Sequence, residues 1–434
     1  MDKRFRFAQN LASWYKEGAA VLLKEAMSSL RRLRSSRFPW LHRILLFCVT
    51  ILLACSQPQA PDVTTSPLAA PPSASTSQAT PNPSLPAETQ AMLASLGQPL
   101  FDPPRGDVRF VVISDLNSAY GSTEYDPEVD KGIALIPFWQ PDMVVCSGDM
   151  VAGQSPTLTQ AEIQAMWAAF DDHVAAPLRG YNLPYGFTIG NHDASSALGV
   201  RGGFLFQQER DLAAEYWNDP NHDPKLEFVD RFEFPFYYTF EQNGIFFLAW
   251  DGSSHIIPPD KLAWAEAALA SDRAQGAKMR ILLGHLPLYS VAIGRDQPGD
   301  VMENADERRL MLEKYNVHTY ISGHHHAYYP AHRGKLQLLH MGILGSGPRP
   351  LIAGNSPPIK AMTVLDINFK DPDLTTYTTY DMQTMTLLEY EALPRFLTGH
   401  NGLLLRRDIE WEDLEPAEKA ACESQLGADQ CTPG

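Results

Sequence analysis

The sequence predicts an α/β layered domain. Short apolar runs of strand length end in Gly, Asp, Asn or His, and amphipathic helical stretches alternate with them. Runs that are apolar on both faces are typical of buried parallel strands. The polar residues after these runs would gather at the carboxyl edge of a sheet, where α/β proteins place their functional groups.

The elements follow the chain in a clear order. The strands expected in the first part are 108–115, 143–149, 184–190, 245–251, 280–285 and 318–323. The helices expected between them are 159–175, 259–273 and 305–315. After residue 335 the pattern changes to strands at 336–341, 361–367 and 375–380, and the aromatic stretch 232–240 is interpreted as sheet core.

Residues 1–54 are expected to form an N-terminal leader. The apolar run 44–54 follows a cluster of arginines and is shorter than the ~20 residues of a spanning helix. It ends in Leu52-Leu53-Ala54-Cys55, which resembles a bacterial lipobox and implies lipidation of Cys55. An uncleaved N-terminal anchor is the alternative, and Met27 is an alternative start. Either way, we expect attachment to the membrane of the cell envelope, on its periplasmic or extracellular face.

Three segments follow the leader. Residues 55–86 are rich in Pro, Ser, Thr and Ala and are expected to form a tether, because they cannot bury enough apolar surface to fold. Residues 87–395 are expected to form the main domain and 396–434 an acidic C-terminal tail. Cys422 and Cys431 in that tail could form a disulfide in an oxidising compartment or remain free thiols.

The charge of the chain excludes one class of partner. The net charge is −16 overall and +7 before Cys55, which leaves −23 for the remainder. Such an acidic body repels the phosphate backbone and argues against bulk nucleic-acid binding. A small phosphorylated substrate stays compatible with this charge, since bound metals reverse the charge locally.

The residues that end the strands form an ordered set of metal ligands. In chain order they are Asp115, Gly148-Asp149, Gly190-Asn191-His192-Asp193, Gly284-His285 and Gly323-His324-His325-His326. Carboxylates, an amide and imidazoles are the donors needed to hold two adjacent divalent ions. Asp149 suits a bridging position because it follows a glycine at a strand end. In an extended segment, His324 and His326 would face one side and His325 the other.

This ordered set resembles the calcineurin-like metallophosphoesterases. The likeness covers roughly residues 107–390 and is nearest the purple-acid-phosphatase-like branch, supported by Lys261-Leu262-Ala263-Trp264 and by the Gly323–Tyr328 segment. The resemblance implies two mixed β-sheets flanked by helices, an α/β/β/α sandwich. It also implies two metal ions, drawn from iron, manganese and zinc.

The resemblance implies a role for each residue. One ion would be held by Asp115, Asp149 and His326, and the other by Asp149, Asn191, His285 and His324. A hydroxide between the metals would be the nucleophile. His192 would assist the leaving group, and Asp193 would orient the His192 imidazole.

The first motif departs from the family pattern. The family usually places His two residues after the first Asp, and this chain has Asn117. Purple acid phosphatases place Tyr three residues after the bridging Asp, where this chain has Ala152. Asn117 is therefore a weaker candidate ligand, and Tyr120 is a second one. Candidate substrate contacts are His325, Tyr120 and His255.

The expected activity is hydrolysis of phosphate esters, foremost phosphomonoesters. A phosphodiesterase acting on cyclic nucleotides or phospholipid heads uses the same metals and remains an alternative. A lipoprotein that binds a phosphorylated ligand without turnover is the non-enzymatic alternative. The insertions 194–235 and 286–304 are expected to form the walls of the substrate site.

Overall fold

The computed structural model describes residues 85–370 and 375–432, which belong to the compact unit Thr80–Gly434. The predicted leader 1–54, Cys55 and nearly all of the predicted tether lie outside the described residues. In the part of the chain that is described, no helix is both long enough and apolar enough to cross a bilayer.

The first sheet has six strands in the order β13-β12-β11-β1-β2-β3. β1 pairs in parallel with β2, which pairs in parallel with β3, whereas β1 and β11 are antiparallel. Every residue of β1 is buried. The strands are β1 (Val108–Ile113), β2 (Met143–Cys146), β3 (Tyr185–Phe187), β11 (Ala361–Ile367), β12 (Thr375–Asp381) and β13 (Thr386–Leu387).

The second sheet has nine strands in the order β14-β15-β9-β10-β8-β7-β6-β5-β4. Its centre is parallel from β6 through β7 and β8 to β10, and its outer strands are antiparallel. The strands are β4 (Phe228–Glu233), β5 (Tyr237–Gln242), β6 (Ile245–Ala249), β7 (Met279–Leu283), β8 (Thr319–Ser322), β9 (Tyr328–Arg333), β10 (Leu336–Met341), β14 (Phe396–Gly399) and β15 (Gly402–Arg406).

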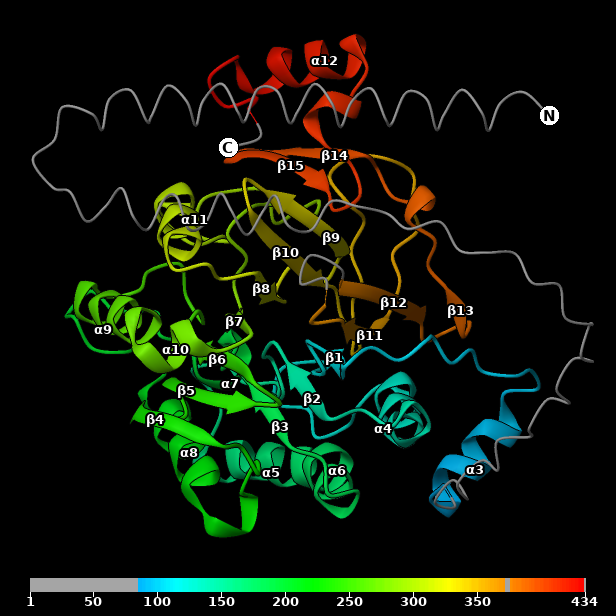
Figure 1. Cartoon of the computed structure of the whole chain (residues 1–434). Helices are drawn as coiled ribbons and strands as arrows, with labels where there is room; N and C mark the ends of the chain where they lie inside the picture. Colours follow the sequence, from blue (N-terminus) through cyan, green and yellow to red (C-terminus); the bar gives the residue numbers. More distant parts are fainter. Residues whose placement is uncertain (1–84, 371–374, 433–434) are drawn as a thin grey trace, which may run out of the picture. The chain divides into compact units, whose positions relative to one another are not determined.

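Helices flank the two sheets (Figure 1). Beside β1–β3 lie α4, α5, α6 and α8, and beside the second sheet lie α9, α10 and α11. The α5 helix begins where the sequence signals it, because Thr159 and Glu162 form a capping box. The helices are α3 (Ala87–Ser95), α4 (Pro127–Trp139), α5 (Gln160–Phe170), the π-helical turn Asp171–Ala175, α6 (Ala176–Gly180), α7 (Asn191–Ala194), α8 (Gln207–Asn218), α9 (Pro259–Ala270), α10 (Asp272–Gly276), α11 (Ala305–Lys314) and α12 (Pro416–Leu426).

The two sheets pack face to face through large side chains. Phe110 of β1 meets Phe247 of β6 edge-on, with ring centroids 5.6 Å apart, and Phe247 stacks on Phe240 of β5 at 4.5 Å. Gly186 of β3 leaves room for Phe240, since a Cβ there would lie 2.9 Å from the Phe240 ring. The predicted arrangement of two mixed sheets flanked by helices is therefore confirmed.

The C-terminal segment corrects the predicted boundary at residue 395. Residues 396–432 are not a separate polar tail, because β14 and β15 extend the second sheet and α12 packs beside them. These elements pack through a small apolar cluster that includes Leu403, Leu405 and Leu414. The same cluster holds a disulfide between Cys422 and Cys431, which resolves the open choice in favour of pairing.

Candidate metal centre

The two sheets bring their functional residues to one place. Asp115, Asp149 and Asn191 follow β1, β2 and β3, so all three come from the carboxyl ends of the parallel strands in the first sheet. His285 follows β7, and His324 and His326 follow β8, in the second sheet. This is the edge at which α/β sheets place ligand sites.

Close backbone approach makes glycine necessary beside two of these residues. A Cβ on Gly190 would lie 2.2 Å from Asp149 Oδ1 and 2.3 Å from the Asp149 nitrogen. A Cβ on Gly148 would lie 2.7 Å from His285 Nδ1, and Gly148 has φ +98°. Asp149 itself is in the left-handed region with φ 55°. The Gly-Asp and Gly-Asn motifs thus have a steric cause.

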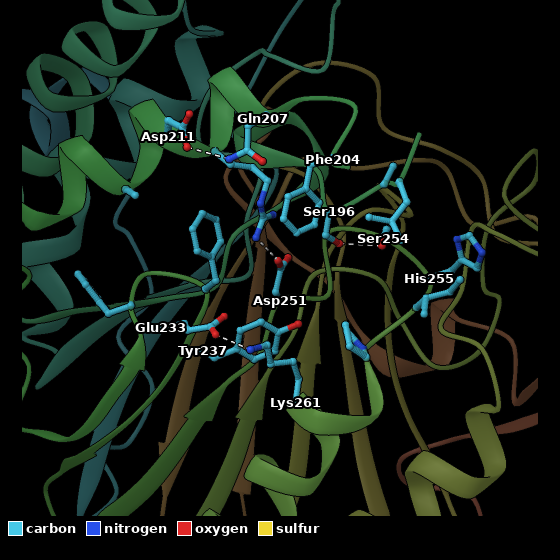
Figure 2. A pocket seen from close by; sticks show the side chains of 18 residues that line it. Ser196, Phe204, Gln207, Asp211, Glu233, Tyr237, Asp251, Ser254, His255 and Lys261 are labelled. Carbon is cyan, nitrogen blue, oxygen red and sulfur yellow. Dashed lines mark hydrogen bonds and ion pairs between the residues drawn. The ribbon is translucent and has the colours of Figure 1, made fainter. Parts of the chain in front are cut away.

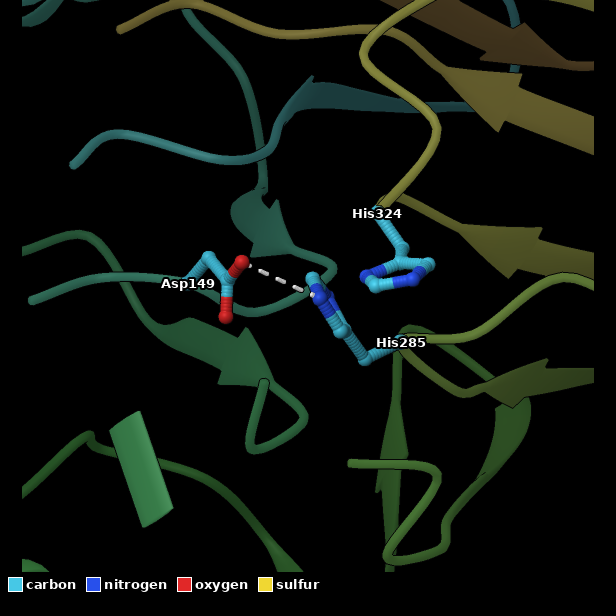
Figure 3. Close-up of side chains that lie close together, drawn as sticks. All are labelled: Asp149, His285 and His324. Atoms are coloured by element: carbon cyan, nitrogen blue, oxygen red, sulfur yellow. Dashed lines mark ion pairs between the residues drawn. The ribbon is translucent and has the colours of Figure 1, made fainter. Parts of the chain in front are cut away.

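The first group of candidate ligands contains Asp149, His285 and His324 (Figure 3). One nitrogen or oxygen atom from each lies within 4.8 Å of the others. The Asn191 amide oxygen joins them, 2.9 Å from His285 Nε2 and 2.8 Å from His324 Nδ1. Atoms bound to one ion at about 2.1 Å each stand roughly 3–3.5 Å apart, so this spacing fits a shared ion.

Neighbouring groups orient two of these ligands. The Asn191 Nδ2 group donates to Gln154 Oε1 at 2.8 Å, which turns the amide oxygen toward the two imidazoles. His285 Nδ1 lies 2.8 Å from the Ser147 carbonyl oxygen. A carbonyl can only accept, so Nδ1 carries the proton and Nε2 is left for a metal.

The second group contains Asp115, Asp149 and His326. His326 Nε2 is 3.3 Å from Asp115 Oδ1, and its Nδ1 lies 3.1 Å from the Gly347 carbonyl oxygen. Nδ1–H therefore donates to Gly347, and Nε2 faces the carboxylate. The Asp115 carboxylate also accepts from the His324 backbone N–H at 3.1 Å.

Asp149 belongs to both ligand groups. The polar groups around it show whether this site suits metal ions. Its Oδ1 accepts the His192 backbone N–H at 2.8 Å, whereas its buried Oδ2 makes no hydrogen bond and lies 3.2 Å from His285 Nε2 (Figure 3). Burial would raise the pKa of Asp149, yet His285 and His192 lower it below its usual range. Burial would lower the pKa of His285, and Asp149 raises it to about 9. An anionic oxygen without a hydrogen bond, amid imidazole and amide donors, fits a site for iron, manganese or zinc.

The backbone around His324 and His326 differs from the extended form predicted for it. Both residues have positive φ values, 63° and 54°. The chain after β8 therefore turns tightly, and a His325 N–H to Gly323 carbonyl bond of 2.7 Å closes the turn. The two imidazoles still reach the two different groups, as expected from the sequence, but a left-handed turn places them there.

His325 is buried within the protein rather than exposed at the surface, which does not favour the predicted substrate contact. The side chain is fully buried, and Nδ1 accepts the Val291 backbone N–H at 3.2 Å. Nε2 lies 2.9 Å from the Asp300 carbonyl oxygen and donates to it. Burial lowers the pKa of His325 well below its usual value, so the ring is neutral. With both ring nitrogens bonded to the segment 286–304, His325 has a structural role.

Asp193 does not orient the His192 imidazole, which corrects a second prediction. Its two oxygens accept four backbone N–H groups, at distances of 2.6–2.9 Å, from Gly190, Asp149, Met150 and Val151. His192 Nδ1 instead lies 3.0 Å from the Gly153 carbonyl oxygen. Burial, and then the charge of Asp149, raise the pKa of Asp193, and the N–H donors oppose this shift. Asp193 thus positions the Asp149 loop rather than an imidazole.

Asn117 and Tyr120 lie in different surroundings. Asn117 is buried, and its backbone N–H donates to the Asp149 carbonyl oxygen at 3.3 Å. Its place beside the Asp115–Asp149 group keeps it a candidate ligand. Tyr120 is 64% exposed, and its ring centroid lies 5.1 Å from that of His192. Tyr120 is therefore placed beside His192 rather than within either ligand group.

The insertion 194–235 lines a cavity of about 560 Å³ together with the segment after β6 (Figure 2). Arg210 in its wall pairs with Asp251 at 2.7 Å and is sandwiched between the Phe204 and Phe236 rings. His255 lies in this wall and is 40% exposed, with Nε2 3.9 Å from Glu303 Oε1. His255 thus lines a cavity, and a substrate contact there stays a prediction.

Four residues around the centre were not anticipated from the sequence. Gln154 holds Asn191, and Arg295 and Asp300 lie 3.3 Å and 3.7 Å from His324 Nε2. Buried Glu209 of α8 fixes the Gln154 loop by accepting its N–H at 2.9 Å, and burial raises the pKa of Glu209 to about 7. The available signals were the two long insertions after ligand motifs, because 194–235 contains Glu209 and 286–304 contains Arg295 and Asp300.

Solved structures show distant similarity to this chain. The purple acid phosphatase PPD1 from yellow lupin seeds is 17% identical, with a TM-score of 0.47 over 66% of this chain and 54% of the lupin chain. GAP50, the anchor in the inner membrane complex of Plasmodium, is 13% identical, with a TM-score of 0.40 over 74% and 94%. The phosphoesterase Yfce from E. coli is 11% identical, with a TM-score of 0.29 over 65% and 97%.

The match therefore spans about half the length of the lupin enzyme. No curated protein sequence matches this chain. The family description "calcineurin-like phosphoesterase" matches residues 108–328, about half of the chain and the whole stretch from β1 to the His-rich turn. The chain accordingly belongs to the calcineurin-like phosphoesterase family.

Proposed function

We propose that the protein hydrolyses phosphomonoesters with two bound metal ions. The observation that carries the proposal is the position of Asp149, which is shared by two groups of ligands and has a buried oxygen that accepts no hydrogen bond. One ion would be held by Asp115, Asp149 and His326, with Asn117 as a further candidate. The other would be held by Asp149, Asn191, His285 and His324.

Two such ions, when bound, supply Lewis-acid polarisation of the phosphoryl group and activation of water near neutral pH. The chain's own contribution is to hold the donor atoms ready. The Ser147 and Gly347 carbonyls fix the tautomers of His285 and His326, and Gln154 fixes the amide of Asn191. Ligands held this way need little rearrangement when they bind a metal.

His192 is proposed to assist the departing alcohol. Its Nδ1–H donates to the Gly153 carbonyl oxygen, so Nε2 is the ring nitrogen that can exchange a proton with a leaving oxygen. Its backbone N–H donates to Asp149 Oδ1, which holds the His192 backbone beside the proposed bridging carboxylate. This contact supports a place for His192 beside the reacting phosphate. A general acid at such a position contributes about 10²–10⁴-fold.

We further propose that the enzyme acts at the cell envelope. The proposal rests on the basic-then-apolar leader and the Leu52–Cys55 sequence, which all lie outside the described residues. Mass spectrometry of the mature N-terminus tests it: a lipid-modified Cys55 is expected. An unmodified chain that begins before Cys55 would favour the uncleaved anchor.

The proposed activity is tested with the purified full-length chain loaded with manganese, iron or zinc. We expect metal-dependent hydrolysis of a chromogenic phosphomonoester, faster than that of the matching diester. Asp149→Asn should abolish it and lower the metal content, because both groups lose their shared carboxylate. Asp130→Asn, the same change at an exposed ion pair with His173, is the matched control.

Each outcome of this test selects one function. Preferred hydrolysis of the diester would replace the monoesterase with a phosphodiesterase. A folded, metal-loaded protein that turns over neither ester would leave only binding of a phosphorylated ligand. Turnover that survives Asp149→Asn would refute the assignment of the site itself.

A further inference from the structure

Two arginines lie beside the His-rich turn and take no part in either ligand group. Arg295 and Arg349 come from two loops that are hydrogen-bonded to each other. Ile293 N–H donates to the Pro350 carbonyl oxygen at 3.0 Å, and Ile352 N–H to that of Val291 at 2.9 Å. These bonds hold the loops side by side, and both loops contact the histidines that follow β8.

Arg295 reaches the outer edge of His324. Its Nη1 is 3.3 Å from His324 Nε2 and donates to Asp300 Oδ1 at 3.0 Å. Its Nε is buried and has no hydrogen-bond partner. The opposite ring nitrogen of His324, Nδ1, faces the Asn191 oxygen. Arg295 therefore lies across the imidazole ring from the candidate ion.

Arg349 has a guanidinium with no hydrogen bond or ion pair to any other residue that the structure describes, and its Nε is buried without a partner. Its backbone N–H donates to the His326 carbonyl oxygen at 2.9 Å. Its Nη1 is 3.3 Å from the position a Cβ on Gly294 would take, so it packs against the residue preceding Arg295. Burial, and then Arg295, lower the pKa of Arg349, which shows that the two cations affect each other.

The positive charge of this pair is only half neutralised. Among the described residues, Asp300 is the one carboxylate that forms an ion pair with either arginine, through Arg295, and its charge also acts on Arg349. The other acid on the same loop, Asp296, is 2.9 Å from His400 and contacts neither arginine. One guanidinium charge and several N–H donors thus remain unused beside a centre for phosphate esters. Arginine binds phosphate with two parallel N–H bonds, and buried donors without acceptors are costly.

We propose that Arg295 and Arg349 form an anion subsite for a second phosphate group of the substrate. The proposal rests on the proposed function and narrows the substrate to a phosphomonoester that carries a further phosphate. The candidate ligand Asn191 faces the Nδ1 side of His324, whereas Arg295 lies on its Nε2 side and Arg349 packs against Gly294, the residue before Arg295. The subsite therefore suits a phosphate separated from the reacting one by a short spacer.

The test measures binding of two inert probes to the metal-loaded full-length protein by calorimetry. Propane-1,3-bisphosphonate and propylphosphonate share a carbon chain, resist hydrolysis and differ by one phosphonate. We expect the wild type to bind the bisphosphonate at least about tenfold more tightly. Arg349→Met should remove this preference, and Arg349→Lys should keep part of it, because lysine retains the charge without the bidentate geometry.

Arg308→Met is the matched control, since Arg308 of α11 also has a buried Nε without a partner. It should leave the preference unchanged. Equal binding of both probes by the wild type would overturn the proposal, as would an equal loss for both probes in Arg349→Met. Turnover of a single-phosphate ester is measured separately. Absence of this turnover would refute the proposed function. The difference in affinity between the two probes would still test the subsite.

Discussion

The two sheets supply different kinds of atom to the same site. The six-stranded sheet delivers oxygens, from Asp115, Asp149 and Asn191, at the ends of three parallel strands. The nine-stranded sheet delivers nitrogens, from His285, His324 and His326, at the ends of β7 and β8. Neither sheet alone holds a complete ligand group, so the centre exists only where the sheets meet.

We call the boundary where the two sheets meet the seam. Hydrogen bonds across it align the half of the site that supplies oxygens with the half that supplies nitrogens. The His324 N–H donates to the Asp115 carboxylate at 3.1 Å, and His285 Nδ1–H donates to the Ser147 carbonyl oxygen at 2.8 Å. The Leu344 N–H donates to the Ser114 carbonyl oxygen at 3.0 Å. The oxygen half is held by backbone and glycine geometry, whereas the nitrogen half depends on contacts from the opposite sheet. A substitution can therefore disturb one half of the site or the seam between the sheets.

The largest effect is expected from Gly190→Ala in the oxygen half. A methyl group there would lie 2.2 Å from Asp149 Oδ1, so the bridging carboxylate must move. We expect loss of both metal equivalents, loss of turnover and a fall of about 3 kcal/mol in the free energy of unfolding. Metal analysis and denaturant titration measure these changes. Gly180→Ala, where a Cβ meets nothing within 4 Å, is the control; equal behaviour of the two variants would contradict the steric argument.

The second-largest effect is expected from Asp193→Asn. This variant distinguishes a role of Asp193 in holding the Asp149 loop from a role in orienting the His192 imidazole. An amide offers one acceptor oxygen where the carboxylate serves four N–H groups. We expect the free energy of unfolding to fall by about 2–3 kcal/mol and metal affinity to weaken. If stability and metal content were unchanged and only turnover of esters with poor leaving groups fell, Asp193 would act on His192 after all.

Lys360→Met tests the seam between the sheets. Lys360 Nζ lies 2.5 Å from Asp126 and 2.6 Å from Glu128, and the neighbouring Ala361 N–H bonds the Ile343 carbonyl oxygen at 2.8 Å. Removing the cation should cost about 1–2 kcal/mol at neutral pH, since both carboxylates are partly exposed.

The pH dependence of the Lys360→Met effect follows from Asp126. Burial opposes its ionisation, but Lys360 and Ser346 lower the pKa of Asp126 below its usual value. The stabilisation is therefore present above the unfolded pKa of about 3.9 and is lost as pH falls below it. The stability difference between wild type and variant should shrink below about pH 4. A difference that stayed constant down to pH 2 would argue against this ion pair.

The smallest effect is expected from Asn117→Ala in the oxygen half. If its amide oxygen completes the Asp115–Asp149–His326 group, one of the two metal equivalents should bind about tenfold more weakly while the other is unchanged. Competition with a metal chelator measures the two affinities. Unchanged affinity at both sites would make Asn117 a loop residue only.

Much of the fold was predictable from local pattern. Every strand expected from an apolar run is present, including β1, β2, β7 and β8, and so are the helices from 159, 259 and 305. The elements that were not predicted include α4, β9, β15 and α12. β15 and α12 lie in a stretch of mainly polar composition, and their stability comes from packing against the sheet rather than from periodicity.

The sequence by itself determined which side chains could form the centre, because Gly-Asp, Gly-Asn-His-Asp and Gly-His-His-His carry the donor types at strand ends. It also separated His324 from His326 into two groups. Only the tertiary structure decided what the remaining polar groups do. Asp193 and His325 lie within two residues of candidate ligands in the chain, yet their hydrogen-bond partners lie up to 44 residues away.

Arg349 is a second case in which the sequence alone did not indicate the role of a polar residue. Nothing near it in the sequence marks it, and its neighbour Arg295 is 54 positions away along the chain. Periodicity and motifs report on interactions within a few residues, whereas the charge left unpaired in a loop depends on which distant loops pack beside it. The candidate donor residues were therefore readable from the chain, whereas the orientation and charge of their surroundings required the packed sheets.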